Sequence, residues 1–300
     1  MSYGGNMNTI QLLNESLNFI ETKLSNGEYE ELTPKKISKI AYMSAFHYQR
    51  CFSMLSGYSL GEYIRKRKLS LATQDLIIKK HKVITIAAKF GYESPEAFSK
   101  AFKRFHGIPP SKIYYNKTIL KAFPPLSFQL TMKGATIMNY KIIKKESFKV
   151  TGYNKKITTV NNENFNILPQ FWNEVMDNGS YTELEDVGLE INPNNSCMGI
   201  CYNQEPEKNQ FDYLIAMKGS FSSKLENSIE ITIPASNWAV FECKGPLPEA
   251  IQKVWKKIYS EWFPATNYEH AGTAELEIYL GGDTSSEDYI CEIWIPLKEK

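Results

Sequence analysis

The stretch VITIAAKFGYESPEAFSKAFKRFHGIPPSKIY, from Val83 to Tyr114, decides the fold of the first part of this chain. Its beginning predicts a short amphipathic helix whose apolar face holds Ile84, Ala87, Ala88 and Phe90. Gly91 follows, and glycine readily takes the positive backbone angles that a tight turn needs. The stretch therefore opens with a helix and a sharp turn.

A second helix begins directly after this turn. Ser94 is a good N-cap, Pro95 stands where its missing N–H costs nothing, and Glu96 suits the positive end of the helix dipole. The inner face is apolar, with Phe98, Ala101, Phe102 and Phe105, and the outer face is basic, with Ser99, Lys100, Lys103 and Arg104. The pattern predicts a helix-turn-helix, although a helical hairpin with a solvated basic face has the same periodicity.

The same unit occurs twice, because a shift of 50 residues superposes its key positions. The matched pairs are Lys39 and Lys89, Tyr42 and Tyr92, Ser44 and Ser94, Phe52 and Phe102, and Gly57 and Gly107. In the first copy Ser44 caps a helix whose outer face holds Ala45, Phe46, Gln49 and Arg50. Residues 59–80 predict a linking helix of roughly 30 Å, close to the ~34 Å of one turn of B-DNA. Two recognition helices on such a spacer can enter successive major grooves.

The paired units and the string GYESPEAFSKAFKRFHGIPP at Gly91–Pro110 resemble the DNA-binding domain of AraC/XylS-type transcription regulators. The resemblance covers about the first 115 residues and implies bipartite recognition of double-stranded DNA by the outer faces of two helices. The residues expected to contact DNA are Ser44, Ala45, Phe46, Gln49, Arg50, Ser94, Pro95, Glu96, Ser99, Lys100, Lys103 and Arg104.

Charge is divided unevenly along the chain, although the net charge of its 300 residues is only +2. Residues 1–121 contain 19 lysines and arginines against 9 acidic residues, and the remainder contains 16 against 24. A basic first part suits the phosphate backbone, whereas DNA repels an acidic second part. The length also favours two domains over one.

The sequence signals no cofactor and no metal. The five cysteines, Cys51, Cys197, Cys201, Cys243 and Cys291, form neither a C-x-x-C pair nor a cluster with histidines. The first residues lack the apolar core of a signal peptide, and no run approaches the ~20 apolar residues of a membrane span. We therefore expect a cytoplasmic protein that does not associate with membranes.

Changes in the spacing of apolar residues along the sequence predict the domain boundaries. Residues 8–25 predict an amphipathic helix that packs on the first helix-turn-helix, and Pro124–Pro125 indicates an extended linker. We expect a DNA-binding domain at residues 1–118, a linker at 119–137 and a second domain at 138–300. The second domain shows the order strand, helix, strand, strand twice, which predicts an α+β fold with an antiparallel sheet and helices on one face, after an all-α first domain.

The second half resembles the GyrI-like effector-binding domain, which binds small, often cationic or lipophilic molecules in regulators of multidrug response. The strings that carry this resemblance are WAVFECKG at Trp238–Gly245, EWFP at Glu261–Pro264, ELEIY at Glu275–Tyr279 and CEIWIP at Cys291–Pro296. Behind two AraC-type units they give the chain the arrangement of Rob-type regulators. Residues 183–195 depart from this pattern in length and loop content.

Candidate ligand-binding residues follow from strand alternation and from this resemblance. Alternation places Glu277 and Tyr279 on one face of their strand, and Glu292 with Trp294 on one face of the last strand. A lone glutamate on a strand is usually solvated, but the resemblance implies a ligand-binding glutamate at Glu277. A carboxylate among aromatic rings suits a large organic cation. The candidates are Glu277, Tyr279, Glu292, Trp294, Trp172, Tyr202, Trp238 and Tyr153, whereas Trp255 is assigned to the core.

The sequence thus favours a transcription regulator, not an enzyme, whose DNA affinity or contact with RNA polymerase responds to a small molecule. Two alternatives stay open. Glu277 with Tyr279 can position water in a small-molecule hydrolase, although no nucleophile triad, metal set or phosphate loop supports that chemistry. The second domain can also be a degenerate pocket that serves as a docking surface for a protein.

Overall fold

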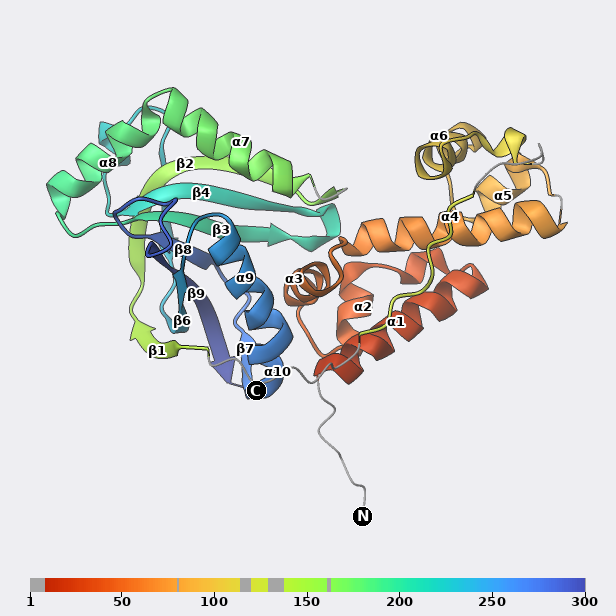
Figure 1. Cartoon of the computed structure of the whole chain (residues 1–300), viewed down its shortest axis with the longest axis horizontal. Helices are drawn as coiled ribbons and strands as arrows, with labels where there is room; N and C mark the ends of the chain where they lie inside the picture. Colours follow the sequence, from red (N-terminus) through yellow and green to blue (C-terminus); the bar gives the residue numbers. More distant parts are fainter. Residues whose placement is uncertain (1–8, 80, 114–119, 129–137, 161–162, 300) are drawn as a thin grey trace, which may run out of the picture. The chain divides into compact units, whose positions relative to one another are not determined.

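The computed structural model describes residues 9–79, 81–113, 120–128, 138–160 and 163–299. The chain divides into two compact units, Met1–Leu130, which is helical, and Thr131–Lys300, which is built on a sheet (Figure 1). The predicted fold class, an all-α double helix-turn-helix followed by an α+β domain with an antiparallel sheet, is confirmed. Tyr114 and Lys80, and parts of the expected linker at 119–137, lie outside the described residues. Among the described helices, none is both long enough and apolar enough to cross a membrane.

The helical unit consists of two helix-turn-helices joined by one long helix. Its helices are α1 (Thr9–Asn26), α2 (Pro34–Ile40), α3 (Ala45–Ser56), α4 (Leu60–Lys79), α5 (Val83–Lys89) and α6 (Pro95–His106), with short 3-10 turns at Tyr29–Glu31 and Pro110–Lys112. Figure 1 shows α4 running between the α2–α3 pair and the α5–α6 pair. Helix α1 packs on the first pair, where the hydroxyls of Ser16 and Tyr48 lie 2.7 Å apart.

The two recognition helices, α3 and α6, begin and end in the same way. The Ser44 hydroxyl accepts a hydrogen bond from the His47 N–H at 3.2 Å, and the Ser94 hydroxyl accepts one from the Ala97 N–H at 3.1 Å. Each helix ends at a glycine with a positive φ, 74° at Gly57 and 85° at Gly107. These caps satisfy the unpaired backbone groups at helix ends, so the repeat seen in the sequence is also a structural repeat.

The second unit is one antiparallel sheet with an internal symmetry. Its described strands are β1 (Tyr140–Lys145), β2 (Phe148–Thr158), β3 (Cys197–Glu205), β4 (Gln210–Lys218), β5 (Ile229–Ile233), β6 (Ser236–Lys244), β7 (Tyr268–His270), β8 (Glu275–Tyr279) and β9 (Ile290–Glu299). They lie in the order β1-β6-β9-β8-β3-β4-β2-β5, with β7 paired to β9. The central six strands form a palindrome, because β6-β9-β8 from one repeat meets β3-β4-β2 from the other. Strands β3 and β8 pair at the junction of the two repeats.

Helices from both repeats cover the same face of this sheet. Helices α7 (Asn164–Asp177) and α8 (Ser180–Ile191) lie over the β2–β4 part, and α9 (Glu249–Lys257) lies over the β6–β9 part, followed by a π-helical turn at Ile258–Trp262 and α10 (Phe263–Ala265). The expectation of loop content at residues 183–195 is wrong up to Ile191. Helix α8 forms there because Gly179 turns the chain with a φ of 83°, and because Leu184 and Gly188 bury one face of the helix.

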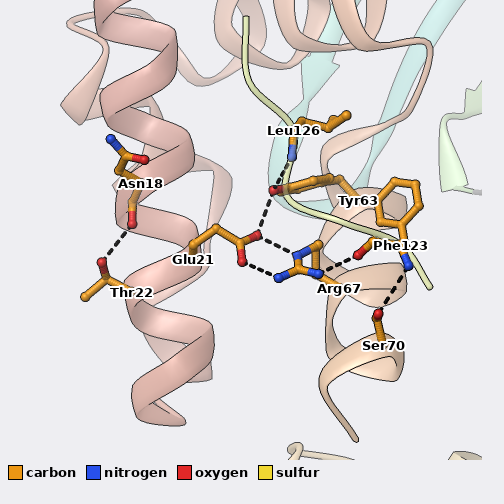
Figure 2. A network of polar contacts seen from close by, with 8 residues as sticks. All are labelled: Asn18, Glu21, Thr22, Tyr63, Arg67, Ser70, Phe123 and Leu126. Atoms are coloured by element: carbon orange, nitrogen blue, oxygen red, sulfur yellow. Dashed lines mark hydrogen bonds and ion pairs between the residues drawn. The ribbon is translucent and has the colours of Figure 1, made fainter. Parts of the chain in front are cut away.

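Residues 120–128, which the sequence places in the linker, pack on the helical unit instead. Figure 2 shows Arg67 of α4 donating to the Phe123 carbonyl oxygen and forming an ion pair with Glu21 of α1. Both nitrogen–oxygen contacts of that pair are short, 2.8 Å from Nε to Oε1 and 2.7 Å from Nη2 to Oε2, and the Tyr63 hydroxyl donates to Oε1 at 2.7 Å. The Arg67 side chain is only 8% exposed, so this bidentate pair is largely shielded from water.

Replacing Arg67 by alanine should therefore destabilise the helical unit by about 3 kcal/mol, because Glu21 would keep a shielded charge without its cation. The control is Lys36→Ala, which breaks the exposed Lys36–Glu31 pair and should cost less than ~1 kcal/mol. Urea unfolding followed by far-UV circular dichroism measures both losses. Equal losses would show that the Glu21–Arg67 pair is worth no more than a surface pair.

Candidate DNA interface and effector site

The outer faces of α3 and α6 carry the residues expected to contact DNA. In α6, Glu96, Lys100, Lys103 and Arg104 are exposed, and Ser94, Pro95 and Ser99 are half-buried. In α3 and its N-cap, Ser44 is exposed and Ala45, Phe46, Gln49 and Arg50 are half-buried. The inner residues Phe52, Phe98 and Phe102 are fully buried and hold each helix against its own core. Each recognition helix is thus held by buried phenylalanines on its inner face and carries accessible polar groups on its outer face.

The candidate effector site lies on β8, which pairs with β3 at the junction of the two repeats. Strand alternation directs Glu277 and Tyr279 toward the helix-covered face, and Leu276 and Ile278 toward the opposite face, where they join a separate apolar cluster. Opposite Glu277 across the strand pair lies Gly199 of β3. The Glu277 carboxylate therefore lies beside a position that carries no side chain.

Three neutral donors surround the Glu277 carboxylate. The indole Nε1 of Trp255, on α9, donates to Oε1 at 2.7 Å. The Tyr279 hydroxyl donates to Oε2 at 2.7 Å, and the Tyr213 hydroxyl lies 3.4 Å from the same oxygen. Among the residues that the structure describes, none of the ion pairs includes Glu277. The carboxylate is hydrogen-bonded but has no described counter-ion.

Trp172 of α7 extends this network to the other repeat. Its indole Nε1 donates to the Tyr213 hydroxyl oxygen at 3.0 Å, and its ring meets the Tyr279 ring edge-on, with centroids 5.2 Å apart and planes at 82°. Trp172, Tyr279 and Glu277 are all half-buried, so each keeps some surface for a ligand. The faces of aromatic rings and a carboxylate both attract a positive charge.

Both tyrosine hydroxyls keep their protons at ordinary pH. Burial raises the pKa of Tyr213 and of Tyr279 well above the usual range, and the negative charge of Glu277 raises both further. Each tyrosine therefore acts as a hydrogen-bond donor toward the carboxylate and not as a second negative charge.

The structure brings together only part of the predicted ligand-binding set. Glu277, Tyr279 and Trp172 meet as described, and Tyr153 lies on the same face but is buried in the core beneath α7. Four other candidates lie on the opposite face of the sheet: Glu292, Trp294, Trp238 and Tyr202. Their placement in the site is wrong, because Glu277 pairs with Ile293, and this register turns the neighbouring Glu292 and Trp294 away.

These four residues have partners of their own on that face. Glu292 accepts hydrogen bonds from Trp294 Nε1 at 2.8 Å and from Lys141 Nζ at 3.1 Å. The rings of Trp238 and Trp294 are 6.0 Å apart, and the Tyr202 hydroxyl donates to Asn154 Oδ1 at 3.0 Å. Glu292 is therefore a half-buried carboxylate that is paired with a lysine.

Sequence reasoning missed two members of the site, Trp255 and Tyr213. Trp255 is 1% exposed, as expected of a core residue, but its indole N–H donates a hydrogen bond to Glu277. A buried tryptophan needs an acceptor for this N–H, and that requirement was the available signal. Tyr213 gave no comparable signal, because only the β3–β4 and β3–β8 registers place it beside Glu277.

Two family models match this chain. Residues 37–114 match the model of a helix-turn-helix domain, and residues 141–297, just over half of the chain, match the model described as integron-associated effector binding protein. The chain belongs to this effector-binding protein family. It combines an AraC-type helix-turn-helix domain with a GyrI-like effector-binding domain, as the resemblances implied, and is an AraC-type DNA-binding transcription regulator.

Individual relatives are similar to parts of this regulator. The multiple antibiotic resistance protein MarA of Escherichia coli (strain K12) is 33% identical over 96 residues, which are 32% of this chain and 72% of MarA. YbfP of Bacillus subtilis, an uncharacterised HTH-type transcriptional regulator, is 33% identical over 109 residues, which span 36% of this chain and about a third (35%) of YbfP. The structure of SAV2435 bound to tetraphenylphosphonium aligns with 54% of this chain and 94% of that chain, at 23% identity and a TM-score of 0.46.

The packing of Tyr213 beside Glu277 requires a glycine at position 199. A Cβ at position 199 would lie 2.1 Å from the Tyr213 hydroxyl and 3.2 Å from Glu277 Oε2. Gly199→Ala should lower the free energy of unfolding of the second unit by about 1–3 kcal/mol, because the fully packed Tyr213 must move.

All five tryptophans lie in the second unit, so urea unfolding followed by tryptophan fluorescence reports this unit alone. The control is Gly281→Ala, since a Cβ at that exposed position has no atom within 4 Å. Equal stability of the two variants would contradict the close packing of Tyr213 over Gly199.

Proposed function

We propose that this regulator binds an organic cation at Glu277 and that the bound cation changes its affinity for DNA. The observation that carries the proposal is a half-buried carboxylate whose described partners are three neutral donors. A negative charge in such surroundings is incompletely compensated, and a cation between the rings of Trp172 and Tyr279 compensates it directly. The same site rejects anions, because the carboxylate repels them.

The DNA part of the proposal places α3 and α6 in successive major grooves on one side of the duplex. Arg50 is a half-buried residue of α3, and Lys100 holds the corresponding, exposed position of α6. An arginine can bond a guanine edge in bidentate fashion, whereas a lysine acts as a point charge toward phosphate. Contact with RNA polymerase at the promoter is the further partner that we propose, as the step through which DNA binding affects transcription.

The charge of Glu277 can be tested with two ligands of similar size, methyltriphenylphosphonium and neutral triphenylphosphine oxide. Glu277→Gln keeps the shape of the side chain and removes its charge, so the cation should bind more weakly by roughly 2–5 kcal/mol while the oxide changes little. Isothermal titration calorimetry measures both affinities.

The matched control is Glu292→Gln, because Glu292 also accepts from a tryptophan N–H but lies on the opposite face of the sheet. It should bind both ligands as the wild type does. Equal losses for the cation and the oxide in Glu277→Gln would mean that Glu277 shapes the site without supplying its charge.

The DNA contacts can be tested on a duplex that the wild-type protein selects from a random-sequence library. Arg50→Ala should cost ~1–3 kcal/mol and relax sequence preference in one half of the selected site. Lys100→Ala should weaken binding to all sequences more evenly and reduce the salt dependence. Lys253→Ala, an exposed lysine of α9, serves as the control. Wild-type affinity in both Arg50→Ala and Lys100→Ala at fixed salt would refute these contacts.

A further inference from the structure

Residues 120–128, hereafter the strap, follow the second helix-turn-helix in the sequence but contact both of them. The strap belongs to the helical unit, which extends to Leu130. Its contacts fall into three groups, one at each end and one in the middle. The first group lies on α6, the middle group on α4, and the last group on α1 and α3.

The first end of the strap is attached to the recognition helix α6. The backbone N–H of Lys121 donates to Nδ1 of His106, the last residue of that helix, at 3.2 Å. The Thr73 hydroxyl donates to the Leu69 carbonyl at 2.7 Å, so His106 Nε2 donates to Thr73 across the 2.8 Å that separate them. The imidazole is therefore neutral, and burial lowers its pKa. His106 links α6, α4 and the strap.

The middle of the strap lies along the linking helix α4. The Phe123 N–H donates to the Ser70 hydroxyl at 3.2 Å, and Arg67 donates to the Phe123 carbonyl. Three residues later, the Leu126 N–H donates to the Tyr63 hydroxyl at 3.3 Å. Figure 2 shows these bonds on successive turns of one helix.

The second end of the strap is bonded to α1 and packs on the recognition helix of the first helix-turn-helix. The Asn14 side chain of α1 forms two hydrogen bonds with the backbone of Phe128, one to its N–H and one to its carbonyl, both 2.8 Å long. The Phe128 ring packs edge-on against Phe52, with centroids 6.0 Å apart and planes at 87°. Phe52 lies in the inner face of the recognition helix α3.

We propose that the strap is a second spacer beside α4 that fixes the orientation of the two recognition helices. Both helix-turn-helices pack on α4, which contacts α3 and the α5–α6 pair, so without a further connection α4 alone resists rocking of one helix-turn-helix against the other. A strap that is bonded to α6, α4 and α1, and packed on α3, opposes that motion. Asn14 is accordingly a positioning residue for DNA recognition, although it lies on α1 and on neither recognition helix.

The relative orientation of the two recognition helices matters because a bipartite DNA site is bound most tightly when both helices occupy their half-sites at once. Once one helix occupies its groove, the local concentration of the other helix at its own half-site depends on how narrowly its position is restricted. Loosening the strap lowers that concentration without changing either recognition surface. This inference rests on the proposed bipartite recognition, and the experiment below separates the two.

In the full chain, Asn14→Ala removes both bonds to Phe128, and Ser70→Ala independently removes the acceptor on α4 for the Phe123 N–H. Asn18→Ala is the matched control, because Asn18 is exposed one turn further along α1 and only its backbone carbonyl accepts from Thr22. Each protein is titrated with the duplex selected by the wild type and with the same duplex carrying one scrambled half-site. Thermal unfolding confirms that each variant is folded at the assay temperature.

Asn14→Ala and Ser70→Ala should lose about tenfold in affinity for the intact duplex and little for the scrambled one, while Asn18→Ala matches the wild type. Unchanged affinity of both strap variants for the intact duplex would overturn the proposal. Equal losses on both duplexes would also overturn it, because the strap would then support folding and not orientation. A wild type that binds both duplexes equally would refute bipartite recognition itself, and the strap proposal with it.

Discussion

The hydrogen bonds to the Glu277 carboxylate are the interaction that joins the two repeats of the second unit. Trp255 holds one oxygen from α9, and Tyr279 holds the other from within β8. Tyr213 connects the same carboxylate to Trp172 and thereby to α7. One charged group thus joins the helices of both repeats. In the proposed function, a cation that draws the carboxylate toward itself competes with these donors, and this competition would link ligand binding to the position of the helices.

The palindromic sheet explains why this group lies where it does. Each repeat contributes one strand of the β3–β8 pair, and the helices of each repeat flank that pair on one face. A site at such a junction can be contacted from both halves of the unit. Glu275, two residues before Glu277 on the same face, is held in a similar way, because the Tyr259 hydroxyl donates to it at 2.6 Å. Trp255 and Tyr259 stack on each other, so successive turns of one helical segment hold successive carboxylates.

Local chemistry made the helical unit predictable, and long-range register limited the prediction of the site. Ser94, Gly107 and the phenylalanine spacing specify α6 within a few residues, and the first copy repeats them. The strap was not predictable, because Pro124–Pro125 favours extended backbone and the bond between Asn14 and Phe128 joins residues 114 positions apart. Alternation within β9 was predicted correctly, but only its pairing with β8 decides that Glu292 faces away from Glu277.

The account joins a cation site in one unit to DNA recognition in the other, and thermodynamic linkage tests that claim directly. The measurement is the affinity of the full chain for its selected duplex with and without saturating methyltriphenylphosphonium, together with the affinity for the cation with and without duplex. The account predicts that the two affinities change by the same factor, about 5- to 150-fold for a typical coupling free energy of 1–3 kcal/mol. Tight cation binding at Glu277 with no change in either affinity would contradict it.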